Sequence, residues 1–228
     1  MPRHLTPAAL LDECDTLMFD MDGTLLDLAF DNYMWLQHIP AAYARQNGLR
    51  DDEARSRLYA HYRRLQGQLE WYCLDHWSER LGIDVLALHR AEHQRIGWLP
   101  GARSFLAAQA GQGRRLLLVT NSHPDTLRVK DEVTGIGAFF DRIYSAHDFG
   151  HAKEQQSFWR KLAAVEPFAR ERTLFVDDTE PVLASAQRFG IGNLLAVTRP
   201  DTSQPTRRGG RFAGIAGVAE LLRAADGD

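Results

Sequence analysis

The chain has 228 residues, of which 44% are hydrophobic and 25% are charged, and its formal net charge is −3. This length can bury one large core, or a core that carries a sizeable insertion. The lack of excess positive charge argues against a nucleic-acid polymer as a partner. Cysteine occurs only at Cys14 and Cys73, and we expect both to be buried thiols. Because the sequence shows no signal-like stretch and no apolar run of membrane-spanning length, we expect a cytoplasmic protein with no membrane partner.

The first predicted element is a buried strand over residues 16–19, an apolar run that stops at Asp20. A second carboxylate, Asp22, follows two residues later. Side chains alternate along a strand, so the turn after Asp20 must redirect Asp22 if both carboxylates are to share one site. Gly23 gives the turn that freedom. A surface turn explains these residues equally well when they are taken alone.

Residues 27–97 are rich in helix formers, charges and aromatic side chains. We predict helices there, the first kinked by Pro40 and several ended by glycine, at 28–48, 51–65, 69–81 and 85–96. The simplest interpretation is a helical domain inserted into a core that is formed by residues 1–26 and 98–228. His89 and His93 are four residues apart on the last helix, and we interpret them as an exposed helix face rather than half of a metal site.

From residue 98 onward, predicted strands and helices alternate. We expect strands at 116–119, near 143–144, at 173–176 and at 194–197, and helices at 102–110, 125–134, 153–165, 180–189 and 215–224. Continuous apolar strands separated by helices predict an α/β fold, a Rossmann-like parallel sheet with helices on both faces. The loop 199–211 contains Arg199, Arg207, Arg208 and Arg211, and we interpret it as a solvated loop rather than a binding patch.

Polar side chains follow the predicted strands where these end. Thr120 and Asn121 follow one strand, Asp177 and Asp178 follow another, and Lys153 begins a predicted helix between them. Open parallel sheets bind ligands at the carboxyl ends of their strands. A phosphate would receive a hydrogen bond from Thr120 and positive charge from Lys153. Because the carboxylates would repel that phosphate, the pattern also predicts Mg²⁺, which prefers oxygen ligands and binds carboxylates and a phosphate together.

Taken in order, these residues resemble the four signature motifs of the haloacid dehalogenase-like hydrolase superfamily. The motifs are Asp20-Met21-Asp22-Gly23-Thr24, Thr120-Asn121, Lys153 and Asp177-Asp178. Each motif alone is weak, but the ordered set is specific, and the resemblance covers essentially the whole chain. The insertion at 27–97 falls where that superfamily places a helical cap domain.

The resemblance implies a Mg²⁺-dependent phosphatase that works through an aspartyl-phosphate intermediate. Asp20 would be the nucleophile, and Asp22 would act first as acid and then as base. Mg²⁺ would bind the Asp20 carboxylate, the backbone carbonyl of Asp22 and the Asp177 carboxylate. Asp178 would orient Lys153 or a metal-bound water, or bind the metal directly. The phosphoryl group would be held by Thr120, Asn121 and Lys153.

Substrate choice would come from side chains outside these motifs. Aromatic rings and an amide could stack on a nucleobase and read it, although packing between helices explains any single ring as well. The candidates are Asn32, Tyr33, Trp35, Trp71, Tyr72 and His123, the last of which either contacts substrate or only begins a helix. The surrounding stretches resemble 5'-nucleotidases of the superfamily that prefer GMP and IMP, which implies a purine nucleoside monophosphate as substrate. The alternative is a phosphosugar phosphatase or phosphomutase of the same superfamily. A non-enzymatic binding protein is disfavoured, because no essential group is missing.

Overall fold

The computed structural model describes residues 7–222. Its centre is a parallel sheet with the strand order β3-β2-β1-β4-β5-β6. The strands are β1 Thr16–Phe19, β2 Arg115–Thr120, β3 Arg142–Ser145, β4 Thr173–Asp177, β5 Asn193–Val197 and β6 Gly214–Ile215. The predicted α/β fold with a parallel sheet is confirmed. From β1 the chain adds β2 and β3 on one side of the sheet and then β4, β5 and β6 on the other side. The direction in which strands are added therefore reverses between β1 and β4.

Strand β1 lies in the middle of the sheet, and all of its side chains are buried. Leu17 and Phe19 join a hydrophobic core on one face, together with Leu118 of β2. Met18 points to the other face and packs in a second core with Phe175 of β4. A strand buried on both faces needs apolar residues at every position, which explains the continuous apolar run in the sequence.

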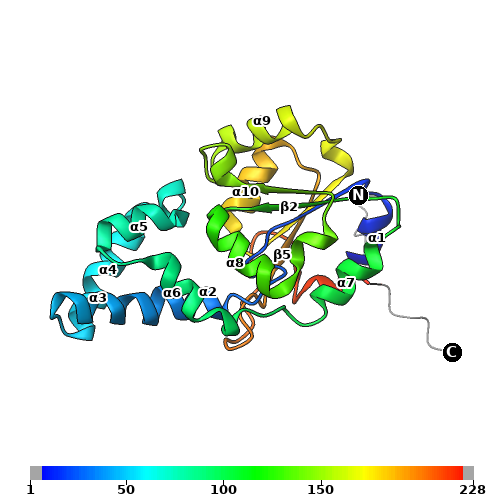
Figure 1. The fold of residues 1–228 in the computed structure, drawn as a ribbon. Coiled ribbons are helices and arrows are strands. Elements are labelled where there is room, and N and C mark those ends of the chain that lie inside the picture. Colours follow the sequence, from blue (N-terminus) through cyan, green and yellow to red (C-terminus); the bar gives the residue numbers. More distant parts are fainter. Residues whose placement is uncertain (1–6, 223–228) are drawn as a thin grey trace.

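Helices cover both faces of the sheet (Figure 1). On the Met18 side lie α9, Gln156–Val165, and α10, Glu180–Phe189. The opposite face is covered by α7, Ala102–Gln109, and α8, Pro124–Thr134, with α1, Pro7–Asp12, near the amino terminus. Within residues 7–222, every helix falls short of the length and apolarity that a membrane span requires.

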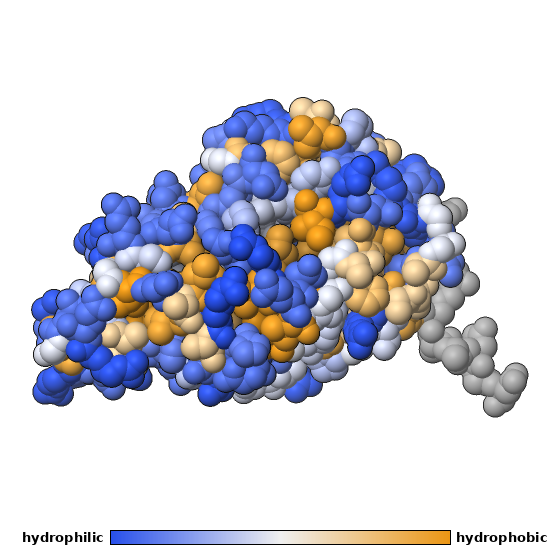
Figure 2. Space-filling view, in the orientation of Figure 1, coloured by the Kyte–Doolittle hydropathy of each residue, from blue (hydrophilic) through white to orange (hydrophobic). Residues whose placement is uncertain are grey.

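A second group of helices, which we call the helical block, lies to one side of the sheet (Figure 1). It consists of α2 Ala29–Tyr33, α3 Ile39–Asn47, α4 Asp51–Leu65, α5 Leu74–Leu81 and α6 Val85–Ala91. Figure 2 shows that its outer end is largely hydrophilic, whereas hydrophobic residues come to the surface mainly toward the middle of the molecule.

The helical block is connected to the rest of the molecule through two chain segments that lie side by side. Leu26 and Trp98 form an antiparallel bridge. Backbone hydrogen bonds of 2.9 Å also run from Asp27 N to Gly97 O and from Leu99 N to Leu25 O. The chain therefore leaves the sheet and returns to it at one place.

The predicted kink at Pro40 takes the form of a π-helical turn, Met34–His38, between α2 and α3. Proline cannot donate to the carbonyl four residues earlier, and its ring crowds that carbonyl, so a wider turn relieves the contact. The carbonyl concerned belongs to Leu36, and it accepts a hydrogen bond from Tyr59 Oη of α4 at 2.9 Å instead. A side chain from the next helix thus supplies the donor that proline lacks.

The predicted helix over 69–81 is interrupted at Cys73. Residues Leu69–Tyr72 form a 3₁₀ turn, and α5 begins only at Leu74. Cys73 Sγ accepts a hydrogen bond from the backbone N–H of His76 at 3.5 Å and so caps α5. The helix predicted from Lys153 also begins later, at Gln156, which leaves Lys153 in the preceding turn.

The closing helix predicted at 215–224 is wrong. Gly214–Ile215 forms the edge strand β6, and Val218–Leu221 forms a 3₁₀ turn, while residues 223 and 224 lie outside the described residues. Ile215 pairs with Val197 of β5 and is buried there. A strand of two residues has no periodicity that the sequence could reveal.

Aromatic side chains fill the interior of the helical block. Trp77 is fully buried, and its ring lies 5.1 to 5.9 Å from the ring centroids of Trp35, Tyr62 and Trp71. All of these contacts are edge-to-face, a geometry that aromatic rings favour. The indole N–H of Trp77 donates to the carbonyl oxygen of Trp71 at 2.9 Å. We call these four side chains the aromatic cluster.

We expect Trp77→Ala to lower the free energy of unfolding by about 3–5 kcal/mol, because it empties the centre of the aromatic cluster and removes an indole hydrogen bond. Equilibrium unfolding in urea measures this change. Val165→Ala is the control, since Val165 is exposed at the end of α9 and its truncation should change stability by less than about 0.5 kcal/mol. A loss below about 1 kcal/mol for Trp77→Ala would show that the cluster does not stabilise the helical block.

Candidate active site

The strand ends that carry the predicted chemistry lie side by side. Strand β1 pairs with β2 on one side and with β4 on the other, all in parallel. Asp20, Thr120 and Asp177 therefore emerge at the same edge of the sheet. This edge is also where the strand order changes direction, the place where open parallel sheets usually bind ligands.

The ammonium of Lys153 lies at the centre of this edge. Its Nζ is 2.5 Å from Asp20 Oδ1, 2.8 Å from Asp177 Oδ2 and 3.0 Å from the carbonyl oxygen of Val119. Burial by itself lowers the pKa of Lys153, but the carboxylates of Asp177 and Asp20 outweigh burial and raise it. The lysine is therefore charged at neutral pH although it is almost completely buried.

The turn that carries Lys153 is fixed by neighbouring side chains. Asn121 Oδ1 accepts the backbone N–H of Lys153 at 2.9 Å, and Asn121 Nδ2 donates to Glu154 at 3.1 Å. The indole N–H of Trp159 in α9 donates to the carbonyl oxygen of Lys153 at 2.8 Å. In the structure, Asn121 thus acts on the position of Lys153, while Thr120 is buried beside it at the end of β2.

Asp22 has partners of its own. Its Oδ1 lies 2.6 Å from Lys130 Nζ, and its Oδ2 accepts a hydrogen bond from Ser122 Oγ at 2.6 Å. The same ammonium lies 2.7 and 2.8 Å from the two carboxylate oxygens of Asp31 in α2. Lys130 therefore joins the turn after β1, helix α8 and the helical block through one buried charge.

Gly23 permits this turn. Its φ is +81°, in the region that favours glycine. A Cβ at this position would lie 2.8 Å from Asp178 Cγ and 2.9 Å from Pro200 Cβ. The predicted conformational freedom is used, and the missing side chain also lets the turn pack closely against the loop after β4.

Burial raises the pKa values of three carboxylates at this edge, those of Asp20, Asp177 and Asp178. The pKa of Asp20 rises to about 7 for this reason, although Lys153 opposes the shift. Burial likewise raises the pKa of Asp177 and of Asp178 to about 6. Such a donor set consists of oxygen atoms only, and a hard divalent cation would stabilise its ionised form. The residues present therefore fit an ion of this kind.

Asp178 is hydrogen-bonded to two neighbours at the rim of the site. Thr179 Oγ1 donates to its Oδ1 at 3.0 Å. Arg207 Nη1 lies 3.2 Å from its Oδ2 and donates to its carbonyl oxygen at 2.7 Å. The expectation of a freely solvated loop at 199–211 holds for the exposed Arg208 but not for Arg207, which this ion pair fixes.

Two adjoining pockets open at this edge. The larger, which we call the polar pocket, has a volume of about 610 Å³ and contains Asp20, Thr120, Lys153 and Asp177. The smaller, which we call the aromatic pocket, has a volume of about 210 Å³ and is bounded largely by the helical block. The side chains common to both are Asp22, Leu28, Trp71, Tyr72 and Ser122.

Five of the six predicted substrate residues line these pockets. Trp35, Asn32 and His123 line the aromatic pocket, whereas Trp71 and Tyr72 line both. Three of them are also hydrogen-bonded. Asn32 Nδ2 donates to Asp201 at 2.7 Å, Tyr72 Oη donates to Glu154 at 2.8 Å, and His123 Nδ1 accepts the N–H of Asp125 at 3.3 Å and caps α8.

Tyr33 lies outside both pockets. Its ring stacks on that of His38 at a centroid distance of 5.5 Å, and the guanidinium of Arg95 lies 4.0 Å from the ring centre. The expectation that Tyr33 faces the substrate does not hold in this structure, because the side chain lies against His38 of the π-helical turn and Arg95 of the turn after α6.

Comparison with known proteins agrees with this geometry. The family described as haloacid dehalogenase-like hydrolase matches residues 14–190. The chain belongs to this family. The hydrolase is 43% identical to the GMP/IMP nucleotidase YrfG of Escherichia coli over 190 residues, which are 83% of this chain and 86% of that protein.

The fold of this haloacid dehalogenase-like hydrolase is also shared with solved structures. A HAD phosphatase from Thermococcus onnurineus superposes with a TM-score of 0.77 at 20% identity, over 91% of this chain and 95% of the other. The putative HAD-hydrolase YfnB from Bacillus subtilis, described as bound to magnesium, superposes with a TM-score of 0.67 at 19% identity, over 91% and 96%.

Histidines and cysteines of this hydrolase meet the expectations in part. His93 is exposed, as expected, but His89 is buried, lines the aromatic pocket and is hydrogen-bonded to the carbonyl oxygen of Val85 at 2.8 Å. The expected exposure of His89 is wrong, because α6 turns this side chain into the interior of the helical block, against Phe30 and Trp35. Cys14 is a buried thiol, as expected, and burial raises its pKa to about 11. Cys73 is only half-buried.

The ion pair of Lys130 with Asp22 and Asp31 is not among the contacts predicted from the sequence. A signal was present, because Thr126, Val129 and Lys130 form the buried face of α8. A lysine on the apolar stripe of a predicted helix points inward, where it needs carboxylate partners.

We expect Lys130→Met to destabilise this hydrolase more at pH 8 than at pH 5.5. Burial raises the pKa of Asp31 from 3.8 to about 7, and Lys130 opposes that shift. Without Lys130 the pKa rises further, so Asp31 is neutral with or without Lys130 at pH 5.5, whereas at pH 8 the folded variant must either hold a proton that the unfolded chain releases or ionise Asp31 without a partner. A buried charge left alone costs about 3–5 kcal/mol, which urea unfolding at the two pH values would measure.

The double variant Lys130→Met with Asp31→Asn is the matched control. It removes the carboxylate together with its partner, so most of the extra loss at pH 8 should disappear. An equal loss at both pH values for Lys130→Met alone would contradict the assigned ion pair.

Proposed function

We propose that this hydrolase is a Mg²⁺-dependent 5'-nucleotidase that acts on purine nucleoside monophosphates. The observation that supports it most is the junction of the polar pocket, which contains Asp20 and Lys153, with the aromatic pocket, which is lined by Trp35 and Trp71. A nucleotide carries a phosphate at one end and an aromatic base at the other, so its two ends match the two pockets. The similarity to a protein named GMP/IMP nucleotidase supports the same substrate class.

In the first proposed step, a carboxylate oxygen of Asp20 forms a bond to phosphorus, and the bond from phosphorus to the nucleoside oxygen breaks. Protonated Asp22 gives its proton to that oxygen, and the nucleoside leaves. The Lys153 ammonium and the Thr120 hydroxyl bind the phosphoryl oxygens. The phosphoryl group then remains on Asp20 as an acyl phosphate.

In the second proposed step, water attacks the phosphorus and Asp22, now a carboxylate, accepts the proton of that water. The bond from phosphorus to the Asp20 oxygen breaks, so inorganic phosphate leaves and the Asp20 carboxylate is restored. Lys130 and Ser122, each 2.6 Å from an oxygen of Asp22, hold this carboxylate in place for both proton transfers. Mg²⁺, held by Asp20, Asp177 and the Asp22 carbonyl, would supply positive charge to the phosphoryl oxygens.

We further propose that the helical block, residues 27–97, is the cap of this site. It contributes Asn32, Trp35 and Trp71 to the pocket walls, whereas the sheet supplies the residues that surround the phosphate. A cap of this kind selects the base and excludes water from the reacting phosphate.

We expect Asp20→Asn to reduce hydrolysis of GMP by at least about a thousandfold, because an amide is a poor nucleophile of nearly the same size. The release of inorganic phosphate measures the rate, and circular dichroism checks the fold. The same carboxylate-to-amide change at Asp51, which is exposed at the start of α4, should leave the rate unchanged. Residual activity above a few per cent in pure Asp20→Asn would exclude Asp20 as the nucleophile.

We expect activity to be lost on chelation and restored by Mg²⁺, with Ca²⁺ a poor substitute because its coordination is larger and looser. Protons compete with the metal for Asp20, whose pKa is about 7, and for Asp177, whose pKa is about 6. The affinity for Mg²⁺ should therefore increase as the pH rises from 5.5 to 8. Magnesium titrations of activity at several pH values measure this. Full activity after exhaustive chelation would refute the metal requirement.

We expect GMP and IMP to be cleaved about tenfold to a hundredfold faster than AMP, because a buried donor that pairs with the 6-oxo group is left unpaired by an amino group, at a cost of about 1–3 kcal/mol. Trp35→Ala and Trp71→Ala should slow GMP cleavage while a small aryl phosphate is little affected. The control is Trp77→Ala, which alters packing but lines neither pocket. Equal losses on both substrates for Trp35→Ala and Trp71→Ala would assign these rings to packing alone. Formation of an isomer instead of free phosphate would indicate a phosphomutase.

A further inference from the structure

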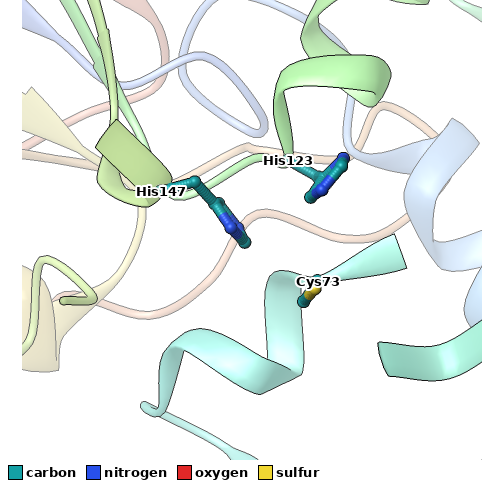
Figure 3. A group of neighbouring side chains, drawn as sticks. All are labelled: Cys73, His123 and His147. Carbon is teal, nitrogen blue, oxygen red and sulfur yellow. The ribbon is translucent and has the colours of Figure 1, made fainter. Parts of the chain in front are cut away.

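Three side chains from distant parts of the chain converge beside the aromatic pocket (Figure 3). Cys73 caps α5 in the helical block, His123 caps α8, and His147 lies in the 3₁₀ turn Ala146–Asp148 after β3. One ligand atom from each, the sulfur of Cys73 and a ring nitrogen of each histidine, lies within 4.8 Å of the other two. This combination of a thiol with two imidazoles has no part in the phosphate chemistry proposed above.

His147 presents an unused lone pair to this cluster. Its Nε2 is buried and has no hydrogen-bond partner within residues 7–222. The ring is hydrogen-bonded to the backbone of Asn121, so the proton lies on Nδ1 and Nε2 is free to bind a metal. Burial lowers the pKa of His147, as does the nearby His123. A buried nitrogen without a partner is unfavourable, and a metal ion would satisfy it.

His123 is surrounded by carboxylates suited to a metal ligand. Its Nε2 lies 3.8 Å from Asp75 Oδ2, and its Nδ1 lies 3.7 Å from Asp125 Oδ2. If Nε2 binds a metal, the ring proton moves to Nδ1, which then gives up the cap hydrogen bond from the Asp125 N–H and donates to the nearby Asp125 carboxylate instead. A carboxylate behind a metal-bound histidine is a common arrangement. Asp75 follows Cys73 by two residues and approaches from the solvent side.

We propose that Cys73, His123 and His147 bind a transition-metal ion of the zinc type, with Asp75 as the fourth ligand. Thiolate and imidazole ligands favour such ions over Mg²⁺. Around tetrahedral zinc, the ligand atoms are about 3.3–3.8 Å apart, given bonds of about 2.0–2.3 Å. Movements of about 1 Å would close the cluster around an ion. The site differs in chemistry from the all-oxygen site at Asp20, so the two ions do not compete.

The ion has its own route to this site. Cys73 and His147 line a surface cavity of about 420 Å³ together with Gly150 and Gln155, and this cavity shares no lining residue with the aromatic pocket. Because Cys73 belongs to the helical block and the histidines follow β2 and β3, the bound ion ties the helical block to the sheet. Its binding can be tested without any assumption about the reaction.

The test is a titration of the full-length protein with Co²⁺ in the presence of excess Mg²⁺, which occupies the all-oxygen site. We expect one equivalent of Co²⁺ to produce a thiolate-to-cobalt charge-transfer band in the near ultraviolet, and Zn²⁺ to displace it. Cys73→Ser should abolish the band. His147→Gln should weaken binding by at least about tenfold to a hundredfold, the range found even for residues that only support a metal ligand.

Matched variants separate this site from other thiols and histidines. Cys14→Ser should keep the band, and His93→Gln, which changes an exposed histidine, should keep the affinity. Circular dichroism first checks each variant, and His147→Gln keeps the test decisive if Cys73→Ser, which alters the cap of α5, fails to fold. A wild-type spectrum without the band, a band that survives Cys73→Ser, or an affinity unchanged by His147→Gln would each overturn the site.

Discussion

Two carboxylates, Asp20 and Asp177, leave adjacent strands and meet one buried ammonium, that of Lys153. Carboxylates at this depth are costly unless a cation compensates them, and a buried cation is costly without carboxylates. Strands β1 and β4 must therefore lie side by side, and the turn before α9 must bring Lys153 to their ends. Asn121 and Trp159 hold that turn by its backbone. The position of the charge thus depends on both the sheet and the helices that cover it.

The part of the site that follows from strand order could be predicted from the sequence. Apolar runs that end in Asp20, Thr120 and Asp177 indicate buried parallel strands, and the carboxyl ends of such strands share one edge. The position of Lys130 in α8 signals a buried ammonium, but its pairing with Asp31 could not be predicted, because it joins residues 99 positions apart and depends on how the helical block meets α8. The convergence of Cys73 with His147 could not be predicted either, because it also depends on how the helical block packs against the rest of the chain. No local pattern records how two distant helices dock.

The aromatic residues of the helical block show why packing and binding interpretations need not exclude each other. Trp35 and Trp71 contact Trp77 in the aromatic cluster, and both also line the aromatic pocket. A ring has two faces and an edge, so one part can pack while another remains available to a ligand. Trp77, buried on all sides, is fixed by the rings around it and in turn fixes the wall of the pocket.

The paired segments at Leu26 and Trp98 constrain any movement of the helical block relative to the sheet. Because both connections are tied together at one place, a rotation of the helical block would have its axis near that bridge. Displacement in a rotation grows with the radius from the axis. Asp31 lies in the first helix after the bridge, so such a rotation would displace it little from Lys130, whereas Tyr72, near the middle of the insertion, would move farther from Glu154. The far wall of the pockets is therefore the part that such a rotation would open.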